Sequence, residues 1–257
     1  MTQKSQLYHE TLTSRGVIRL QGKDMFTVWV KPDFCNLTSR HMRKIADITE
    51  KYARRYLLFT TNQNAVIPFV NIKDVDDVLE ELSEVHLRLD RCGPTVRNVK
   101  VCYDEKICPE AVTSCISLAD KLEHFFNIVP PRNKVKIGVA GCNKDCITSR
   151  VLTDIGFVGV KRDSKKGYDV FVGGKLGLTP FVGVRMAECL SEEESVRFLQ
   201  NYFDLINSEG KPRERSADLI RRVGLERVRQ ALNKNLQEGI ALESIESETR
   251  LEEVEAD

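Results

Sequence analysis

Three things are scarce in this sequence: long apolar runs, an excess of one charge, and histidine. No apolar run approaches the ~20 residues that a membrane-spanning helix needs. The opening residues 1–6 lack the apolar stretch of a signal peptide. Lys and Arg number 39 against 38 Asp and Glu, so no global field attracts nucleic acid or an anionic membrane. We therefore expect a cytoplasmic protein that binds neither.

Length and composition set the scale of the fold. The 257 residues, of which 41% are hydrophobic, suffice for one large domain or two modest ones with a real core. The chain holds eight cysteines, but it is neither small nor evidently secreted. A disulfide framework is therefore not expected, and the cysteines need another explanation.

Four of the cysteines form two pairs, Cys102-x5-Cys108 and Cys142-x3-Cys146. Structural zinc sites usually have their first pair two to four residues apart, often with a histidine nearby, and none of the four histidines adjoins these pairs. Sites with four thiolate ligands are typical of iron–sulfur clusters. The pairs therefore predict a [4Fe–4S] cluster; zinc and four unrelated buried thiols are the alternatives.

The other four cysteines are expected to be small buried side chains. They are Cys35, Cys92, Cys115 and Cys189. Cys115 lies seven residues after Cys108, so it could compete as a ligand.

Hydrophobic periodicity predicts an α+β module in the first part of the chain. Alternation predicts strands over 25–30, 55–61 and 65–70, with helices over 38–52 and 73–86. Thr38 is the expected N-cap of the first helix. The segment 90–94, which contains Gly93 and Pro94, is expected to be a domain boundary.

The second part is expected to mix strands and helices around the cysteine pairs. We predict helices over 109–126, 191–207, 214–222 and 225–235, and strands over 135–139, 154–160 and 168–174 with a basic turn at 161–167. Ser191 followed by acidic residues is a clear helix start. The acidic residues from Glu238 to Asp257 predict a mobile tail.

Three basic residues lie near the cysteine pairs in sequence. On composition alone Arg97 is most simply a solvated arginine at a strand end, although its planar group suits an oxyanion. Lys134 and Lys136 have strand spacing and would share a face, while Val135 points to the other. Directly before the second pair, two ammonium groups there could hold a dianion such as sulfite and supply protons.

The paired motifs resemble the cluster-binding region of the sirohaem-dependent sulfite and nitrite reductases. The resemblance extends over roughly residues 15–235 and includes Thr60-Thr-Asn-Gln-Asn64, Asp154-Ile-Gly-Phe-Val-Gly159 and Val170-Phe-Val-Gly-Gly174. It implies a ferredoxin-like half-domain over 1–92 and a sirohaem and [4Fe–4S] domain over 93–237, followed by the tail at 238–257. The implied fold class is α+β.

The resemblance also implies the chemistry and the residues that perform it. Cys102, Cys108, Cys142 and Cys146 would hold the cluster, and Cys146 would also ligate the sirohaem iron. Arg97, Lys134 and Lys136 would bind the anion, with Arg97 and Asn98 also contacting the cofactor. The implied reaction is the six-electron reduction of sulfite to sulfide. An external donor such as a ferredoxin would supply electrons, and the chain would pair with itself or a paralogue.

Some alternatives stay open in the sequence. Nitrite reduction to ammonia and a non-catalytic sirohaem or Fe–S electron-transfer role both fit the same motifs. The family usually has arginine at the positions of Leu58 and Asn62, and a proline–asparagine pattern where this chain has Asn143-Lys-Asp145. Arg54 or Arg55 could substitute for a missing arginine, and Lys144 would add a charge near the cluster.

Overall fold

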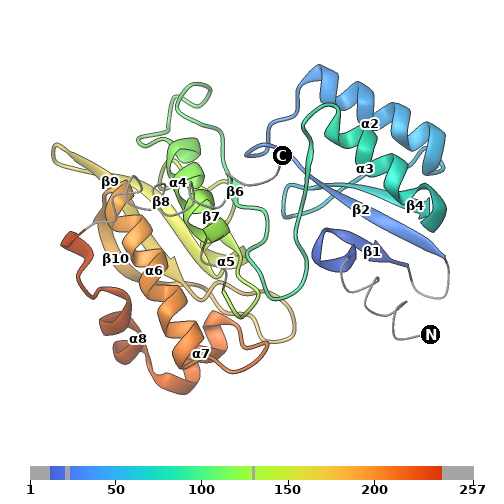
Figure 1. Ribbon diagram of the computed structural model, residues 1–257. Helices are drawn as coiled ribbons and strands as arrows, with labels where there is room; N and C mark the ends of the chain where they lie inside the picture. The colour runs from blue at the N-terminus through green and yellow to red at the C-terminus, as the bar shows by residue number, and fades with distance from the viewer. Residues whose placement is uncertain (1–11, 21–23, 129–130, 239–257) are drawn as a thin grey trace, which may run out of the picture. The chain divides into compact units, whose positions relative to one another are not determined.

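The computed structural model describes residues 12–20, 24–128 and 131–238. The chain divides into two compact units, Met1–Lys100 and Val101–Asp257. Each unit combines a five-stranded sheet with helices, which confirms the α+β class (Figure 1). The predicted domain boundary at residue 92 stays a prediction, and the division into compact units falls eight residues later.

The first unit is an antiparallel sheet with two helices. The strand order is β1-β2-β4-β3, and β5 pairs with β2. Its elements are β1 (Val17–Arg19), β2 (Met25–Lys31), α2 (Ser39–Tyr52), β3 (Leu58–Phe59), β4 (Ala65–Asn71), the 3-10 helix η1 (Ile72–Asp74), α3 (Val75–Ser83) and β5 (Arg88–Leu89). Figure 1 shows α2 and α3 side by side against this sheet.

Alternation along β2 builds the core of this unit. Phe26, Val28 and Val30 point inward, where they meet Ile45 and Ile48 of α2. The predicted N-cap is confirmed: the Thr38 hydroxyl accepts the His41 N–H, and the His41 ring accepts the Thr38 N–H in return.

The second unit is a mixed sheet of order β10-β9-β8-β7-β6. The β7–β8 pair is parallel, whereas β8–β9 and β9–β10 are antiparallel. Its elements are β6 (Lys100–Val101), α4 (Cys115–Ile128), β7 (Ile137–Ala140), α5 (Ser149–Leu152), β8 (Ile155–Arg162), β9 (Lys165–Val172), β10 (Val184–Leu190), α6 (Glu192–Ser208), α7 (Ser216–Val223), α8 (Leu225–Leu232) and the 3-10 helix η2 (Leu236–Glu238).

Helices α4 and α6 cross the same side of this sheet and pack together (Figure 1). The rings of Phe125 and Phe203 stack with centroids 5.9 Å apart. Ser191 caps α6 through a capping box with Glu194, as its sequence predicts. Gly224 separates α7 from α8, in agreement with the predicted break between the helices over 214–222 and 225–235.

Several predicted boundaries were wrong. Helix α4 begins at Cys115 rather than Pro109, because the Val112 N–H donates to the Gly141 carbonyl instead of entering a helix. The strand predicted over 55–61 shrinks to β3, since Arg54 and Arg55 take left-handed backbone angles. The predicted basic turn is mostly strand: Arg162 pairs with Lys165, which leaves a two-residue turn.

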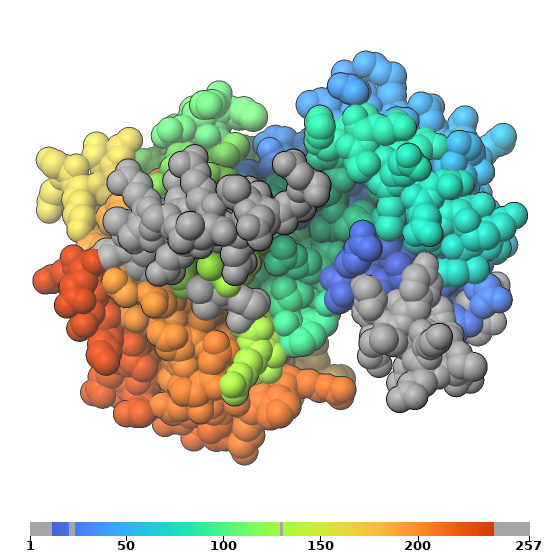
Figure 2. Space-filling model, in the orientation of Figure 1, coloured from blue at the N-terminus to red at the C-terminus, as the bar shows by residue number. Residues whose placement is uncertain are grey.

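Figure 2 shows the turn between β8 and β9, in yellow, projecting from the rest of the second unit. Within the described ranges, no helix has the length and apolar character needed to cross a membrane. The predicted acidic tail lies outside the described residues, apart from Glu238.

Candidate functional site

The first cysteine pair lies in the loop between β6 and α4. The Cys102 N–H donates to the Val139 carbonyl at 3.1 Å, which ties this residue to the end of β7. In the turn that follows Cys102, the Cys108 N–H donates to the Asp104 carbonyl, four residues earlier, at 2.9 Å. Both cysteine side chains are half-buried thiols. Pairing with β7 therefore places Cys102 at a strand end, next to the point where the second cysteine loop begins.

The second pair lies in a tight loop between β7 and α5, and the carboxylate of Asp145 organises it. One oxygen accepts the Ser149 N–H at 2.8 Å and the Ser149 hydroxyl at 2.7 Å, and the other accepts the Arg150 N–H at 3.1 Å. The Asp145 N–H donates to the Cys142 carbonyl. One side chain between Cys142 and Cys146 thus anchors the loop to the start of α5.

Three contacts bring the two cysteine loops together. The Gly141 N–H donates to Sγ of Cys102 at 3.1 Å, and the Gly141 carbonyl accepts the Val112 N–H at 2.8 Å. Lys144 of the second loop forms a 3.0 Å ion pair with Glu110 of the first. The hydrogen bond and the negative charge of Glu110 raise the pKa of Lys144.

A fifth cysteine enters the site. Sγ of Cys115 lies 3.3 Å from Sγ of Cys102. The hydrogen bond with Cys115 lowers the pKa of the Cys102 thiol to about 7, and the Gly141 N–H adds to this effect against the cost of burial. The same pair, together with burial, raises the pKa of Cys115. The two sulfurs therefore share one hydrogen bond, in which either can be the donor.

Gly159 on β8 makes the close packing behind this site possible. A Cβ atom there would lie 2.3 Å from the Thr113 hydroxyl and 2.4 Å from the Gly141 carbonyl oxygen. Both atoms belong to the segments that carry the cysteine loops. Any larger residue at Gly159 would push Gly141, and with it the N–H that faces Cys102, out of place.

The donor set fits an iron–sulfur cluster. Four thiols come from two loops that contact each other, and a backbone N–H points at one sulfur, where such donors tune the potential of a cluster. Within the described parts of the chain, no three His, Cys, Asp or Glu side chains are grouped as around a single metal ion. The four thiolates that bind a four-iron cluster each ligate a different iron, so they do not need to surround a single point.

The two predicted lysines precede β7. Val135 is fully buried while Lys134 and Lys136 are half-buried, which agrees with opposite faces. The Lys136 N–H donates at 2.8 Å to Asp154, whose side chain is 1% exposed. Arg215 binds the same carboxylate through two N–H groups, at 2.9 and 2.7 Å. A buried ion pair thus fixes the backbone that carries Lys136.

Arg97 and Asn98 belong to the first unit, and the carboxylate of Asp90 orders their segment. It accepts the N–H of Asn98 at 2.9 Å and the side-chain amide of Asn64 at 2.6 Å. Arg97 is 9% exposed and donates to the Arg91 carbonyl, so the expectation of a solvated arginine was wrong.

The two positions that lack family arginines differ in their surroundings. The carbonyl of Asn62 accepts the side-chain amide of Asn98 at 2.9 Å, so this residue takes part in ordering the Arg97–Asn98 segment. Leu58 is 53% exposed on the edge strand β3. Of the expected substitutes, Arg54 lies over the Phe69 ring, 5.1 Å from its centroid.

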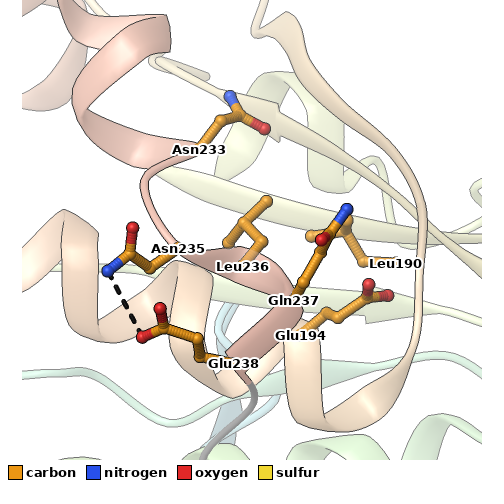
Figure 3. A pocket seen from close by; sticks show the side chains of 7 residues that line it. All are labelled: Leu190, Glu194, Asn233, Asn235, Leu236, Gln237 and Glu238. Atoms are coloured by element: carbon orange, nitrogen blue, oxygen red, sulfur yellow. Dashed lines mark hydrogen bonds between the residues drawn. The ribbon is translucent and has the colours of Figure 1, made fainter.

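A pocket of about 480 Å³ lies elsewhere in the second unit (Figure 3). It is lined by Leu190, Glu194, Asn233, Asn235, Leu236, Gln237 and Glu238, and Asn235 donates to Glu238 across its edge. None of the predicted ligands or basic residues lines it. The pocket is therefore not the candidate site.

Comparison with known families accounts for most of the chain. The family model described as the nitrite and sulphite reductase 4Fe-4S domain matches residues 92–239, more than half of the chain. The model described as the nitrite/sulfite reductase ferredoxin-like half domain matches residues 18–85. All four paired cysteines fall in the first of these matches.

Individual relatives carry sulfite or nitrite reductase names. The chain is 24% identical to an assimilatory-type sulfite reductase of Nitratidesulfovibrio vulgaris, covering 85% of this chain and 97% of that protein. It is 29% identical to a nitrite reductase [NAD(P)H] of Bacillus subtilis, covering 76% of this chain but only 23% of that protein. The first relative is therefore matched over nearly its whole length and the second over about a quarter.

Solved structures show the same fold. The crystal structure of dissimilatory sulfite reductase I superposes with a TM-score of 0.74 at 14% identity, covering 81% of this chain and 69% of that one. The NirA protein of Mycobacterium tuberculosis gives a TM-score of 0.75 at 19% identity, covering 90% and 47%. At these identities the likeness establishes the fold.

Sequence reasoning missed the residues that hold the site in shape. Asp145, Asp154 and Asp90 are buried carboxylates that bind backbone N–H groups across a loop or between segments. Their only signal in the sequence is an acidic residue beside a predicted ligand or strand. Cys115 is buried, as predicted, but its distance from Cys102 in sequence gives no hint of the contact between the two sulfurs.

Proposed function

Because the chain belongs to the nitrite and sulphite reductase 4Fe-4S domain family, we propose that it is a sulfite reductase haemoprotein or one subunit of it. The cofactors implied by the family and the relatives are a [4Fe–4S] cluster and a sirohaem. Their chemistry is the delivery of electrons, one at a time, to a bound anion. Sulfite takes up six electrons, and its oxygens leave as water after protonation.

The cluster ligands we propose are Cys102, Cys108, Cys142 and Cys146. The observation that carries this assignment is the convergence of the two loops through the Gly141 N–H and the ion pair of Lys144. Cys146 has the most exposed of these four thiols. It is therefore our candidate for the bridge to the sirohaem iron, as the resemblance implies.

We propose, as the resemblance implies, that Arg97, Lys134 and Lys136 are the residues that bind the anion. Cationic groups balance the charge of a bound dianion, and the lysine ammonium groups can donate protons to its leaving oxygens. The Asp154–Arg215 pair supports this role, because it fixes the backbone of Lys136. Asp90 acts similarly on the segment with Arg97 and Asn98, and both of these residues are proposed to contact the sirohaem.

Sulfite is our first candidate for the substrate. The relative that the chain matches over 97% of its length is named an assimilatory-type sulfite reductase. Nitrite reduction to ammonia is the second candidate, favoured by the nitrite reductase of Bacillus subtilis. The two anions differ in geometry and in charge at neutral pH. We therefore expect the enzyme to turn them over with different kcat/KM values.

Electrons are proposed to come from an external donor such as a ferredoxin, in line with relatives named ferredoxin–nitrite reductases. We also propose that the chain assembles with a second copy or a paralogue. The described cysteines are all free thiols, and a reducing compartment such as the cytoplasm would keep them so.

Anaerobic turnover tests the proposal. The purified full chain, reconstituted with iron, sulfide and sirohaem, is given a chemically reduced viologen and either sulfite or nitrite. We expect sulfide from sulfite, with a higher kcat/KM than for ammonia from nitrite. A higher kcat/KM for nitrite would favour the second candidate. A protein that binds both cofactors and turns over neither anion would be an electron-transfer protein, and zinc without iron would contradict the proposal altogether.

A further inference from the structure

Cys115 is a fully buried thiol that has no place in the paired motifs. It is the first residue of α4, and its backbone N–H donates to an Asp104 carboxylate oxygen at 2.8 Å. Asp104 also accepts the Ser114 hydroxyl at 3.0 Å, so the start of the helix is fixed from two sides. This anchoring holds the Cys115 sulfur 3.3 Å from that of Cys102.

Ligation determines which of the two sulfurs carries the proton. A cysteine bound to iron does so as a thiolate, with no proton to donate. With Cys102 as a ligand, the shared proton therefore belongs to Cys115. Sγ of Cys102 then accepts two hydrogen bonds, one from the Cys115 thiol and one from the Gly141 N–H at 3.1 Å.

We propose that Cys115 is a positioning residue that donates its S–H to the Cys102 thiolate and raises the reduction potential of the cluster. This inference rests on the proposed assignment of Cys102 as a cluster ligand. When the cluster is reduced, one electron enters it and no bond forms or breaks. The added negative charge spreads onto the ligand sulfurs, so a donor at one of them stabilises the reduced form more than the oxidised form.

Gly141 leaves room for the Cys115 thiol beside Cys102. A Cβ atom at Gly141 would lie 3.0 Å from the Cys115 sulfur, and the Gly141 N–H donates to the same Cys102 sulfur. Because the thiol is buried, water cannot replace it as a donor if it is removed.

The test is a redox titration of the cluster in the full chain, followed by electron paramagnetic resonance of the reduced form. Cys115→Ala and Cys115→Val remove the donor, and the valine variant fills the space should alanine impair cluster assembly. Cys115→Ser keeps a donor. Cys189→Ala is the matched control, since it removes another buried thiol of the same unit, whose sulfur lies 4.0 Å from the Lys165 carbonyl oxygen.

We expect a more negative midpoint potential in the alanine and valine variants at unchanged iron and sulfide content. The serine variant should stay nearer to the wild type, and the control should equal it. An unchanged midpoint in Cys115→Ala or Cys115→Val would overturn the inference. So would a cluster that survives Cys102→Ala but is lost in every Cys115 variant, because Cys115 would then be the ligand. A wild-type protein that assembles no cluster would instead refute the proposed function.

Discussion

Replacing Asp145 with asparagine should weaken both the second cysteine loop and its hold on the cluster. The Asp145 side chain is 8% exposed and its two oxygens accept the N–H of Ser149, the Ser149 hydroxyl and the N–H of Arg150. Asparagine keeps one acceptor oxygen and turns an amide NH₂ toward the remaining donors. At least one backbone N–H therefore loses its partner in a buried place.

The magnitude follows from that single lost partner. An unsatisfied buried donor costs about 1–3 kcal/mol. For a unit of this size, this corresponds to a decrease in Tm of roughly 2–12 °C. The loss falls on the segment between Cys142 and Cys146, so we expect cluster content to fall as well. The Cys142 carbonyl would lose a well-placed donor when the Asp145 backbone shifts.

The assay combines thermal unfolding of the second unit with iron and acid-labile sulfide analysis of anaerobically purified protein. Asp204→Asn is the matched control, because Asp204 is an exposed residue of α6 and the change in charge is the same. Equal Tm and equal cluster content in Asp145→Asn and in the control would refute the idea that this carboxylate shapes the loop.

Three further outcomes are expected. Lys136→Gln should lower kcat/KM for sulfite about 10–100-fold with an unchanged chromophore, because a charge-assisted hydrogen bond contributes about 1.5–3 kcal/mol; an unchanged kcat/KM would remove Lys136 from the anion site. Arg215→Leu should destabilise the second unit by about 3 kcal/mol in urea unfolding, since it leaves the buried Asp154 carboxylate without its cation; a loss below about 1 kcal/mol would contradict this reasoning. In the first unit, the hydrogen bond from Lys51 lowers the pKa of Glu81 below its ordinary value of 4.5, so its stabilising effect is present above that pH and lost as the pH falls through the folded-state pKa. The stability gap between wild type and Glu81→Gln should therefore close under acid, and a gap that is constant with pH would count against the pair.

The parts of the fold that could be predicted are those with local signals. Thr38 and Ser191 each provide a hydroxyl that caps a helix, with a reciprocal partner three residues later. The alternation from Met25 to Val30 predicts β2 because one face is buried. These features depend on residues a few positions apart, so the sequence displays them directly.

Contacts between distant segments could not be predicted in this way. Strand β10 was not predicted, because the charged residues Arg185 and Glu188 interrupt its apolar pattern. These two residues form an ion pair on the surface. Helix α4 begins late because the preceding N–H of Val112 is used by Gly141, which is 29 positions away in the sequence.

The candidate site shows the same division. Spacing alone identifies the four paired cysteines, and the lysines flanking Val135 follow from strand periodicity. The carboxylates and the thiol that position them act through long-range hydrogen bonds. Asp154 reaches Arg215, and Cys115 meets Cys102, only once the sheet and α4 have formed.

The central claim is that four cysteines from two loops hold one cluster, with Cys146 joining it to a sirohaem. The most direct measurement is the absorption spectrum of anaerobically purified wild-type protein and of Cys146→Ala, with iron and acid-labile sulfide assayed on the same samples. We predict about five irons and four sulfides per chain in the wild type, and loss of the sirohaem bands together with the cluster in the variant. A Cys146→Ala protein with the full spectrum and iron content of the wild type would contradict the claim.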